Sequence, residues 1–322
     1  MKELQFIEII KKTLPSSCKY IGDDTAFLSD KGIIITQDTL VEDVHFRLTT
    51  ISPFQLGYKS IAVNLSDIAA GAAIAKYCLI SLSLPKNINN AFIEGFYKGV
   101  KAICEFFNVD VIGGDITGAE KLTVSITAIG YTEGVQPASR KNAKENDIVF
   151  VTGHFGSSAA GLWCLENNYN SDKFIKSHLM PMPRLTEARK ILEKSKHPLT
   201  LMDASDGLAD ALAKISSMSE VSMEINAIDI PIDSDIKNIA GKANINSYYD
   251  WILFGGEDYE LVGTMPESLF NELNHNELNI KKIGKVIKKE LNSTVFVQLN
   301  DKTLEINMET LNQQTFDHFK ED

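Results

Sequence analysis

Aspartates beside glycine or other turn-forming residues recur along the 322-residue chain, mostly where an apolar run ends. If folding gathers them, their carboxylates repel one another by roughly 4 kcal/mol per pair at about 4 Å and an effective dielectric near 20. A fold keeps such a cluster when cations neutralise it, and Mg²⁺, which binds carboxylates and substrate phosphates, is well suited. Any single segment is also explained by a turn or a helix cap. The segments are Gly22-Asp23-Asp24, Thr36-Gln37-Asp38-Thr39, Asn64-Leu65-Ser66-Asp67, Gly113-Gly114-Asp115, Asp203-Ala204-Ser205-Asp206-Gly207 and Gly255-Gly256-Glu257-Asp258.

Composition limits the classes of protein to consider. Asp and Glu total 43 against 32 for Lys and Arg, a net charge of −11, which argues against a nucleic-acid surface or an anionic membrane face. No stretch approaches the roughly 18 apolar residues of a membrane span, and charges interrupt residues 1–8, unlike a signal peptide. Cys18, Cys78, Cys104 and Cys164 show neither zinc-type spacing nor a disulfide framework. We therefore expect a cytoplasmic protein with free thiols and without nucleic-acid or membrane partners.

The first part of the chain has the periodicity of mixed α and β structure. A helix begins at Ser52 and Pro53, and apolar residues recur along it at helical spacing: Phe54, Tyr58, Ile61, Leu65 and Ile68. Asn64 and Asp67 share a neighbouring face, which places Asp67 on a rigid element. A further helix is expected at 91–107. Strands are expected at 32–36, 77–84, 122–130 and 109–112, the last ending in Gly113-Gly114-Asp115.

The polar stretch at 139–147 interrupts the apolar pattern and is the best domain boundary. It divides the chain into domains at 1–138 and 139–322. Beyond it, strands are expected at 148–153 and 199–202 and helices at 156–167, 184–194 and 207–219. Residues 255–262 read as a glycine turn that enters a strand. This alternation predicts an α/β layer, so the fold class is α/β.

The usual nucleotide-binding and nucleophile motifs are missing. The chain has no G-x-x-x-x-G-K-[ST] loop, no H-R-D or D-F-G set, no G-x-G-x-x-G after a strand, no G-x-S-x-G and no H-E-x-x-H. Phosphate would therefore be held by metal ions more than by a glycine loop. Among the histidines, His45 follows the Thr36-to-Thr39 segment closely enough to touch a substrate, and a packed or solvated role explains it equally well.

Together, these segments resemble the thiamine-monophosphate kinase family over nearly the whole chain. Each string alone is weak, but their order along the chain is that of the family, and Phe316-Asp317-His318-Phe319 also resembles its C-terminus. The wider superfamily includes aminoimidazole-ribonucleotide synthetases, selenophosphate synthetases and hydrogenase-maturation enzymes. The strings that carry the resemblance are Ile21-Gly22-Asp23-Asp24, Thr36-Gln37-Asp38-Thr39-Leu40-Val41, His45-Phe46, Lys59-Ser60-Ile61-Ala62-Val63-Asn64-Leu65-Ser66-Asp67, Gly113-Gly114-Asp115, Ser205-Asp206-Gly207-Leu208 and Gly255-Gly256-Glu257-Asp258-Tyr259-Glu260-Leu261.

The resemblance implies a set of functional residues. Several Mg²⁺ ions would be held by Asp24, Thr36, Gln37, Asp38, Asp67, Asp115, Asp203 and Asp206. ATP, the co-substrate, would contact Gly114, Asp115, Arg140 and Ser205, and the acceptor would contact His45, Glu257 and Phe316. Two departures stand out. At position 37 the family usually has Ser or Thr, and this chain has Gln. The change matters only if a side-chain hydroxyl, and not the main-chain carbonyl, binds the metal. At positions 116–118 this chain has Ile116-Thr117-Gly118, where the family commonly has two threonines and a basic residue.

The resemblance also implies a reaction and an assembly. A phosphate monoester oxygen is already ionised at neutral pH, so transfer from ATP to thiamine monophosphate needs no general base. We expect direct in-line transfer on several Mg²⁺ ions, giving thiamine diphosphate and ADP without a phosphoenzyme, in a homodimer formed through the sheet of an α+β N-terminal domain. Another ATP-dependent synthetase of the superfamily, or a non-catalytic dimer that binds metal and nucleotide, is the alternative.

Overall fold

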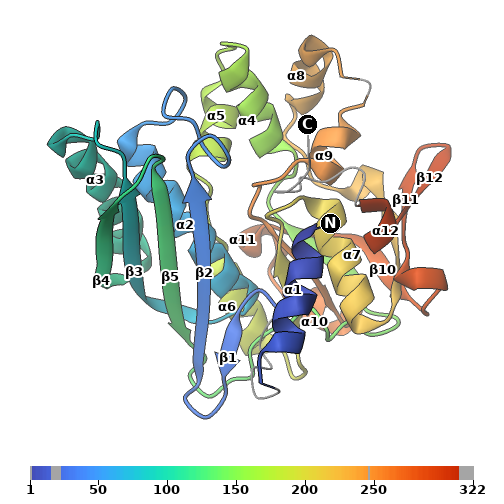
Figure 1. The fold of residues 1–322 in the computed structure, drawn as a ribbon. Coiled ribbons are helices and arrows are strands. Elements are labelled where there is room, and N and C mark those ends of the chain that lie inside the picture. Colours follow the sequence, from blue (N-terminus) through green and yellow to red (C-terminus); the bar gives the residue numbers. More distant parts are fainter. Residues whose placement is uncertain (1, 16–22, 246, 312–322) are drawn as a thin grey trace.

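A five-stranded sheet organises the first part of the molecule. The computed structural model describes residues 2–15, 23–245 and 247–311. The strand order in the sheet is β1 (Ala26–Leu28), β2 (Ile33–Val41), β5 (Thr123–Tyr131), β3 (Ile74–Leu84) and β4 (Asp110–Gly118). Neighbouring strands are antiparallel except for the parallel pair β3 and β4. Helices α2 (Pro53–Ala70) and α3 (Asn90–Phe107) cover one face of this sheet (Figure 1).

Helix α2 begins where the sequence predicts. The Ser52 side chain accepts a hydrogen bond from the Gln55 backbone N–H at 3.3 Å, and the Ser52 backbone N–H donates to Gln55 Oε1 at 2.9 Å. This reciprocal pair satisfies amide groups that have no partner within the helix. Most of the predicted stripe is buried, with Ile61, Leu65 and Ile68 fully so, whereas Phe54 is 36% exposed at the helix start.

One element prediction in this part was wrong. The Gly113-Gly114-Asp115 string does not follow a strand as a turn but lies inside β4, which continues to Gly118 and pairs with β3 as far as Leu84. Position 114 must be glycine for β4 to pair this closely with β3, because the Cβ of any other residue would lie 1.8 Å from the Ile80 carbonyl oxygen. Glycine thus serves close strand pairing here and not a turn. β4 is exposed throughout and forms the edge of the sheet.

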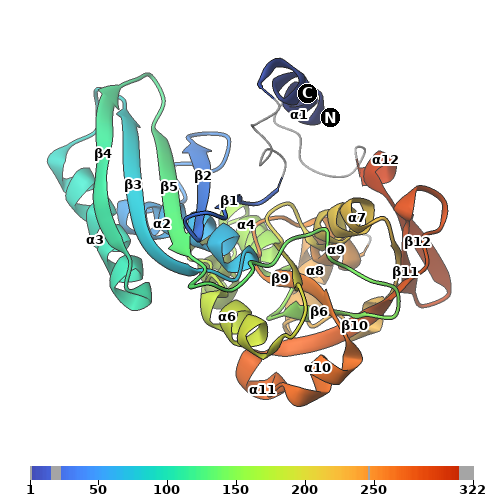
Figure 2. The same ribbon diagram turned by 90° about the horizontal axis from the view of Figure 1, so that it is seen from below.

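A seven-stranded sheet organises the second part, beside the first (Figure 2). Its strand order is β12 (Lys302–Ile306), β11 (Val295–Leu299), β8 (Ser222–Asn226), β10 (Ile280–Ile287), β6 (Ile148–Thr152), β9 (Leu261–Met265) and β7 (Thr200–Asp203). Among the described strands of this second sheet, only β8 and β11 pair in parallel. The mixed α/β class is therefore confirmed, and strand pairing in this sheet is mostly antiparallel.

The remaining helices come from both parts of the chain. Predicted elements at 148–153, 156–167, 184–194, 199–202 and 207–219 correspond to β6, α4, α6, β7 and α7. The helices outside α2 and α3 are α1 (Lys2–Thr13), α4 (Ser157–Glu166), α5 (Asp172–Leu179), α6 (Leu185–Lys194), α7 (Leu208–Ser219), α8 (Ile236–Ala243), α9 (Tyr249–Phe254), α10 (Glu267–Glu272), α11 (His275–Leu278) and α12 (Met308–Leu311). Among the residues described, no helix is both long and apolar enough to cross a membrane.

Helices α2 and α3 touch through glycines. A Cβ at Gly99 would lie 1.8 Å from the Phe54 carbonyl oxygen, and one at Gly57 would lie 2.0 Å from the Phe96 carbonyl oxygen. Each atom is backbone, so neither contact relaxes by a side-chain rotation. The position of α2, and with it that of Asp67, depends on this close approach.

We expect Gly99→Ala to lower the free energy of unfolding by roughly 1–3 kcal/mol, because the added methyl group forces the two helices apart. Urea denaturation measures this change. Gly241→Ala is the control: its Cβ meets nothing within 4 Å in α8, and alanine favours a helix by roughly 0.5–1 kcal/mol. Equal destabilisation by both substitutions would contradict the packing argument.

Candidate active site

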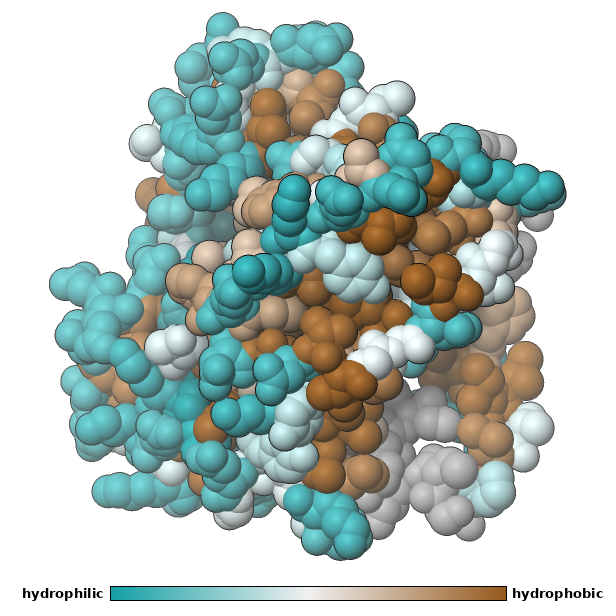
Figure 3. Space-filling model, turned by 90° about the vertical axis from the view of Figure 1, so that its left-hand side faces the viewer, coloured by the Kyte–Doolittle hydropathy of each residue, from teal (hydrophilic) through white to brown (hydrophobic). Residues whose placement is uncertain are grey.

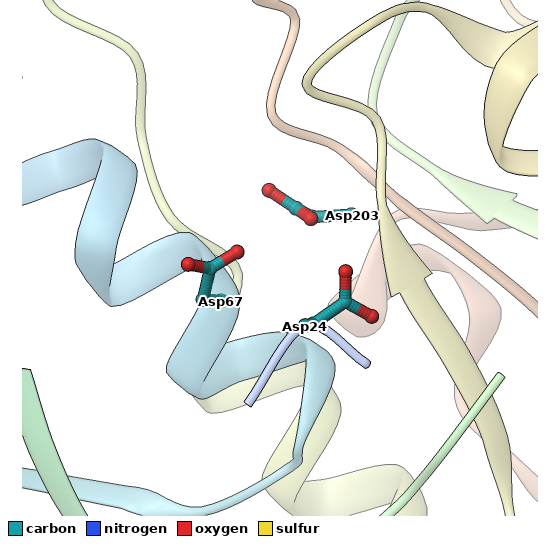
Figure 4. Close-up of side chains that lie close together, drawn as sticks. All are labelled: Asp24, Asp67 and Asp203. Atoms are coloured by element: carbon teal, nitrogen blue, oxygen red, sulfur yellow. The ribbon is translucent and has the colours of Figure 1, made fainter. Parts of the chain in front are cut away.

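Three aspartates from distant parts of the sequence converge at one point (Figure 4). Asp24 precedes β1, Asp67 lies on α2 and Asp203 ends β7. One carboxylate oxygen from each lies within 4.8 Å of the others. All three groups offer oxygen, the donor that hard divalent cations prefer, so this set fits Mg²⁺ as the sequence predicts.

Neighbouring groups hold these carboxylates in place. Thr36 Oγ1 lies 2.5 Å from Asp67 Oδ2, and Ser66 Oγ donates to Asp203 Oδ2 at 2.7 Å. The latter bond joins α2 to the second sheet. Arg140 binds both carboxylate oxygens of Asp24, with Nε at 3.1 Å from Oδ2. One cation of the protein therefore already offsets part of the negative charge.

Asp38 and Asp206 lie at the edge of this cluster. Asp38 is two residues after Thr36 on β2, so both side chains point to the helix-covered face. Its backbone N–H donates to Asn64 Oδ1 at 2.9 Å. Burial, with the charges of Asp206 and Asp24, raises the pKa of Asp38 to about 6. Asp206 lies 3.3 Å from Lys214 Nζ on α7.

The electrostatics of the cluster favour a bound cation. Burial, followed by the charge of Asp24, raises the pKa of Asp203 to about 7. Burial and the neighbouring carboxylates also raise the pKa of Asp67 well above its ordinary value, and burial raises that of Asp24 despite Arg140. Without a cation the group reduces its repulsion by holding protons, which a divalent ion would displace.

Three predicted residues lie away from the cluster. Gln37 points to the opposite face of β2, and its Oε1 accepts a hydrogen bond from Thr127 Oγ1 at 2.9 Å. Gly114 and Asp115 lie on β4, three strand spacings from β2, or roughly 14 Å along the sheet. Within one chain, Asp115 is therefore not gathered with Asp38 and the other carboxylates.

The predicted acceptor contacts lie on another side of α2. Glu257 forms an ion pair with Lys59, with Lys59 Nζ at 3.0 Å from Oε1. His45 lies near enough to Glu257 that a protonated His45 ring would lower the pKa of Glu257. In the structure the His45 Nδ1 accepts a hydrogen bond from the Val41 N–H at 3.0 Å. Ser205 reaches the same segment, since its carbonyl oxygen accepts from the Glu257 N–H at 2.7 Å. Phe316 lies outside the described residues.

Sequence reasoning missed three cationic or titratable neighbours of the site: Lys59, His178 and Lys214. A signal existed for Lys59, because it occupies a helix in which the flanking positions Tyr58 and Ser60 are also buried. A lysine inside such a stretch requires a buried anionic or polar partner. His178 and Lys214 carry no local signal, since their partners are distant in sequence or lie on an ordinary helix face.

The fold that carries the acidic site is that of AIR synthase-related proteins. Residues 22–132 match the family described as AIR synthase related protein, N-terminal domain. The structure of the hydrogenase maturation protein HypE in complex with ATP shares the fold at 16% identity, with a TM-score of 0.69 over 86% of this chain and 84% of that one.

Closer relatives narrow the class to one family. The thiamine-monophosphate kinase of Bacillus subtilis (strain 168) is 40% identical over 317 residues, which cover 93% of each chain. The structure of AaThiL complexed with AMPPCP and TMP is 35% identical, with a TM-score of 0.82 over 95% of this chain and 98% of that one. The thiamine monophosphate kinase structure from Aquifex aeolicus has a TM-score of 0.81 over 93% of this chain and 96% of that one. The chain belongs to the thiamine-monophosphate kinase family.

The raised pKa values predict a pH-dependent effect of Mg²⁺ on stability. The pKa of Asp203 is about 7 in the folded protein and 3.8 for the ordinary side chain, so its ionisation disfavours the folded state. Metal-free protein should lose stability as the pH rises from about 4 to about 7. Mg²⁺ removes the repulsion, so the Mg²⁺-induced rise in Tm should grow between about pH 5 and about pH 8.

Thermal denaturation at matched ionic strength measures this effect. Asp203→Asn, which cannot ionise, should flatten the pH dependence of the metal-free protein. A Tm increase that is the same at every pH and in both proteins would show that Mg²⁺ acts elsewhere.

Proposed function

We propose that the protein transfers the terminal phosphoryl group of ATP to thiamine monophosphate, giving thiamine diphosphate and ADP. Family membership supports the activity, and the structure of one relative is a complex with AMPPCP and TMP. The observation that carries the proposal is the convergence of Asp24, Asp67 and Asp203 in an all-oxygen set beside Arg140. Such a site suits the transfer of a phosphoryl group between two polyanions.

The cluster is the proposed metal site. Asp24, Thr36, Asp38, Asp67, Asp203 and Asp206 hold several Mg²⁺ ions, and Gln37 contributes through its main chain because its side chain points away. Bound Mg²⁺ neutralises negative charge on ATP, acceptor and transition state. Arg140 and Ser205 contact ATP, and the hydrogen bond to Asp24 holds Arg140 beside the cluster.

The acceptor needs no base from the protein. Its phosphate monoester oxygen is ionised at neutral pH and attacks directly, in line with the leaving ADP oxygen. The chain supplies position: His45 and Glu257 in the described part, and Phe316 near the C-terminus, contact thiamine monophosphate. Burial lowers the pKa of the nearby His178 to about 4, which makes it a neutral group at working pH and not a proton carrier.

A homodimer formed through the first sheet is the proposed assembly. The sheet face opposite α2 and α3 carries half-buried Ile35, Leu79 and Ile129, and the edge strand exposes Ile112 and Ile116. Figure 3 shows apolar side chains gathered in a band on this side of the molecule. A contribution of Gly114 and Asp115 to the cluster requires a second copy, because their own cluster lies three strands away.

We further propose domains at 1–138 and 139–322 and a cytoplasmic location. The first sheet ends at Tyr131 and the second begins at Ile148, which brackets the boundary. The cysteines in the described part, Cys78, Cys104 and Cys164, are free and buried, as in a reducing compartment.

A coupled ADP-release assay tests the function. The wild-type protein should release ADP with thiamine monophosphate and Mg²⁺, and not with thiamine, which lacks the attacking phosphate. Asp67→Asn should lower turnover by roughly a hundredfold or more through lost metal charge, while the packing of α2 keeps the fold intact. Asp30→Asn, at an exposed position in the turn between β1 and β2, is the control. Near wild-type turnover of Asp67→Asn at saturating Mg²⁺ would refute the metal assignment.

Light scattering tests the assembly. The wild-type protein should have twice the 35.7 kDa mass of one chain at micromolar concentration. Ile129→Glu places a charge in the middle of the proposed interface and should give monomers with reduced activity. Ile228→Glu, at a residue 74% exposed in the second part of the chain, should leave the dimer unchanged. A fully active wild-type monomer would rule out a need for dimerisation.

A further inference from the structure

Lys59 is a buried cation that joins the two parts of the chain. Its side chain is 1% exposed, and its Nζ lies 3.0 Å from Oε1 and 3.1 Å from Oε2 of Glu257. Lys59 belongs to α2, whereas Glu257 lies between α9 and β9. A buried ammonium group is costly unless an anion or hydrogen-bond acceptors compensate for its lost hydration. Glu257 provides this compensation with both carboxylate oxygens.

The segment that carries Glu257 has little regular structure of its own. Residues 255–260 link α9 to β9, and Glu257 has a left-handed backbone with φ of 66°. The Glu257 N–H donates to the Ser205 carbonyl oxygen at 2.7 Å, and the Tyr259 N–H donates to that of Ala204 at 3.1 Å. These bonds fix the main chain but not the direction of the Glu257 side chain. The ion pair with Lys59 fixes that direction.

His178 also lies beside the Glu257 carboxylate, but it does not neutralise the negative charge of that carboxylate. Its Nδ1 lies 3.3 Å from Glu257 Oε2 and 3.0 Å from Ser158 Oγ. Burial and the Lys59 charge lower the pKa of His178 to about 4, so the ring is neutral at physiological pH. Burial alone would raise the pKa of Glu257, but the Lys59 charge opposes it and the net shift is downward. Lys59 is therefore the group that contributes most to keeping Glu257 ionised.

Helix α2 links this pair to the metal cluster. Lys59 and Asp67 lie on the same helix, roughly 12 Å apart along its axis at about 1.5 Å per residue. The helix is buried along most of its length and is fixed against α3 by glycine contacts. One rigid element thus sets the distance between the aspartate cluster and the side chain that orients Glu257.

We propose that Lys59 is a positioning residue of the acceptor site: it orients Glu257 and balances its charge, so that Glu257 accepts a hydrogen bond from the acceptor. This inference rests on the function proposed above. Lys59 itself does not touch the acceptor, because its side chain is almost wholly buried, whereas that of Glu257 is 26% exposed. Because the pair has no net charge, Glu257 recognises an N–H donor, the pyrimidine amino group of thiamine monophosphate, and not the positive thiazolium ring.

Steady-state kinetics of three variants test the pairing. Lys59→Met and Glu257→Gln should each raise the KM for thiamine monophosphate on the order of tenfold, with the KM for ATP nearly unchanged. The double variant, which leaves no unpaired charge, should show no larger an increase than the single variants, because both act on one interaction. Effects that multiply, an unchanged KM in Lys59→Met, or equal rises in both KM values would overturn the proposal.

Arg184→Met is the matched structural control. Arg184 forms a part-buried ion pair with Glu260, with Nε at 2.6 Å from Oε2, in the same segment as Glu257. Loss of this pair should lower Tm without raising the KM for thiamine monophosphate. If Arg184→Met raises that KM as Lys59→Met does, general loosening of the segment explains the effect and the specific role of Lys59 is wrong.

An acceptor analogue tests the hydrogen bond directly. Replacing the pyrimidine amino group of thiamine monophosphate by a carbonyl oxygen keeps the positive ring, removes the exocyclic donor and leaves a proton on a ring nitrogen instead. The wild-type protein should discriminate against this analogue, and the double variant should lose most of that discrimination. Equal use of both acceptors by the wild-type protein would refute recognition of the amino group. A wild-type protein that releases no ADP with thiamine monophosphate would instead refute the proposed function itself.

Discussion

The mutual repulsion of buried carboxylates is the constraint on which the arrangement of this molecule depends. Asp24, Asp67 and Asp203 come from three separate elements, and their oxygens lie within 4.8 Å of one another. Such a group is stable only when its charge is offset, here by Arg140, by hydroxyl donors and by protons. Asp203 retains its proton because burial and the charge of Asp24 raise its pKa to about 7. The protein alone compensates the cluster incompletely, which is the condition under which a site binds divalent cations.

Helix α2 makes this convergence possible because it contacts both parts of the chain. It covers the first sheet, and through Ser66 it reaches Asp203 at the end of β7 in the second sheet. Its close contact with α3 through Gly57 and Gly99 removes freedom to slide. The hydrophobic core reflects the same role, since one continuous cluster includes residues such as Ile80 of β3 and Leu201 of β7. The site is therefore built around the helix that both sheets contact.

Local sequence signals predicted the elements that carry the cluster but not every contact between them. The capping box at Ser52 and the apolar stripe through Ile61 and Leu65 are short-range patterns, so α2 and the place of Asp67 on it could be read directly. The prediction that the strand ends at Gly113-Gly114 was wrong, because a glycine pair is typical of a turn. Here Gly114 instead allows close pairing with Ile80 of β3, a strand distant in sequence. The mostly antiparallel order of the second sheet and the ion pair of Glu257 with Lys59 also depend on long-range pairing that no local pattern encodes.

Two positions along α2, Lys59 and Asp67, lie beside carboxylates whose negative charge is compensated to different degrees, and the reaction explains this difference. At the cluster, excess negative charge is useful because it attracts the cations that accompany ATP. At the acceptor site proposed for Glu257, an uncompensated carboxylate would repel a phosphorylated substrate and compete for the same cations. Lys59, buried beneath Glu257, removes that repulsion while leaving the carboxylate oxygens as hydrogen-bond acceptors. A buried lysine on the helix that also carries Asp67 thus confines the uncompensated negative charge to the aspartate cluster. The proposed acceptor contact, Glu257, is left as a compensated carboxylate.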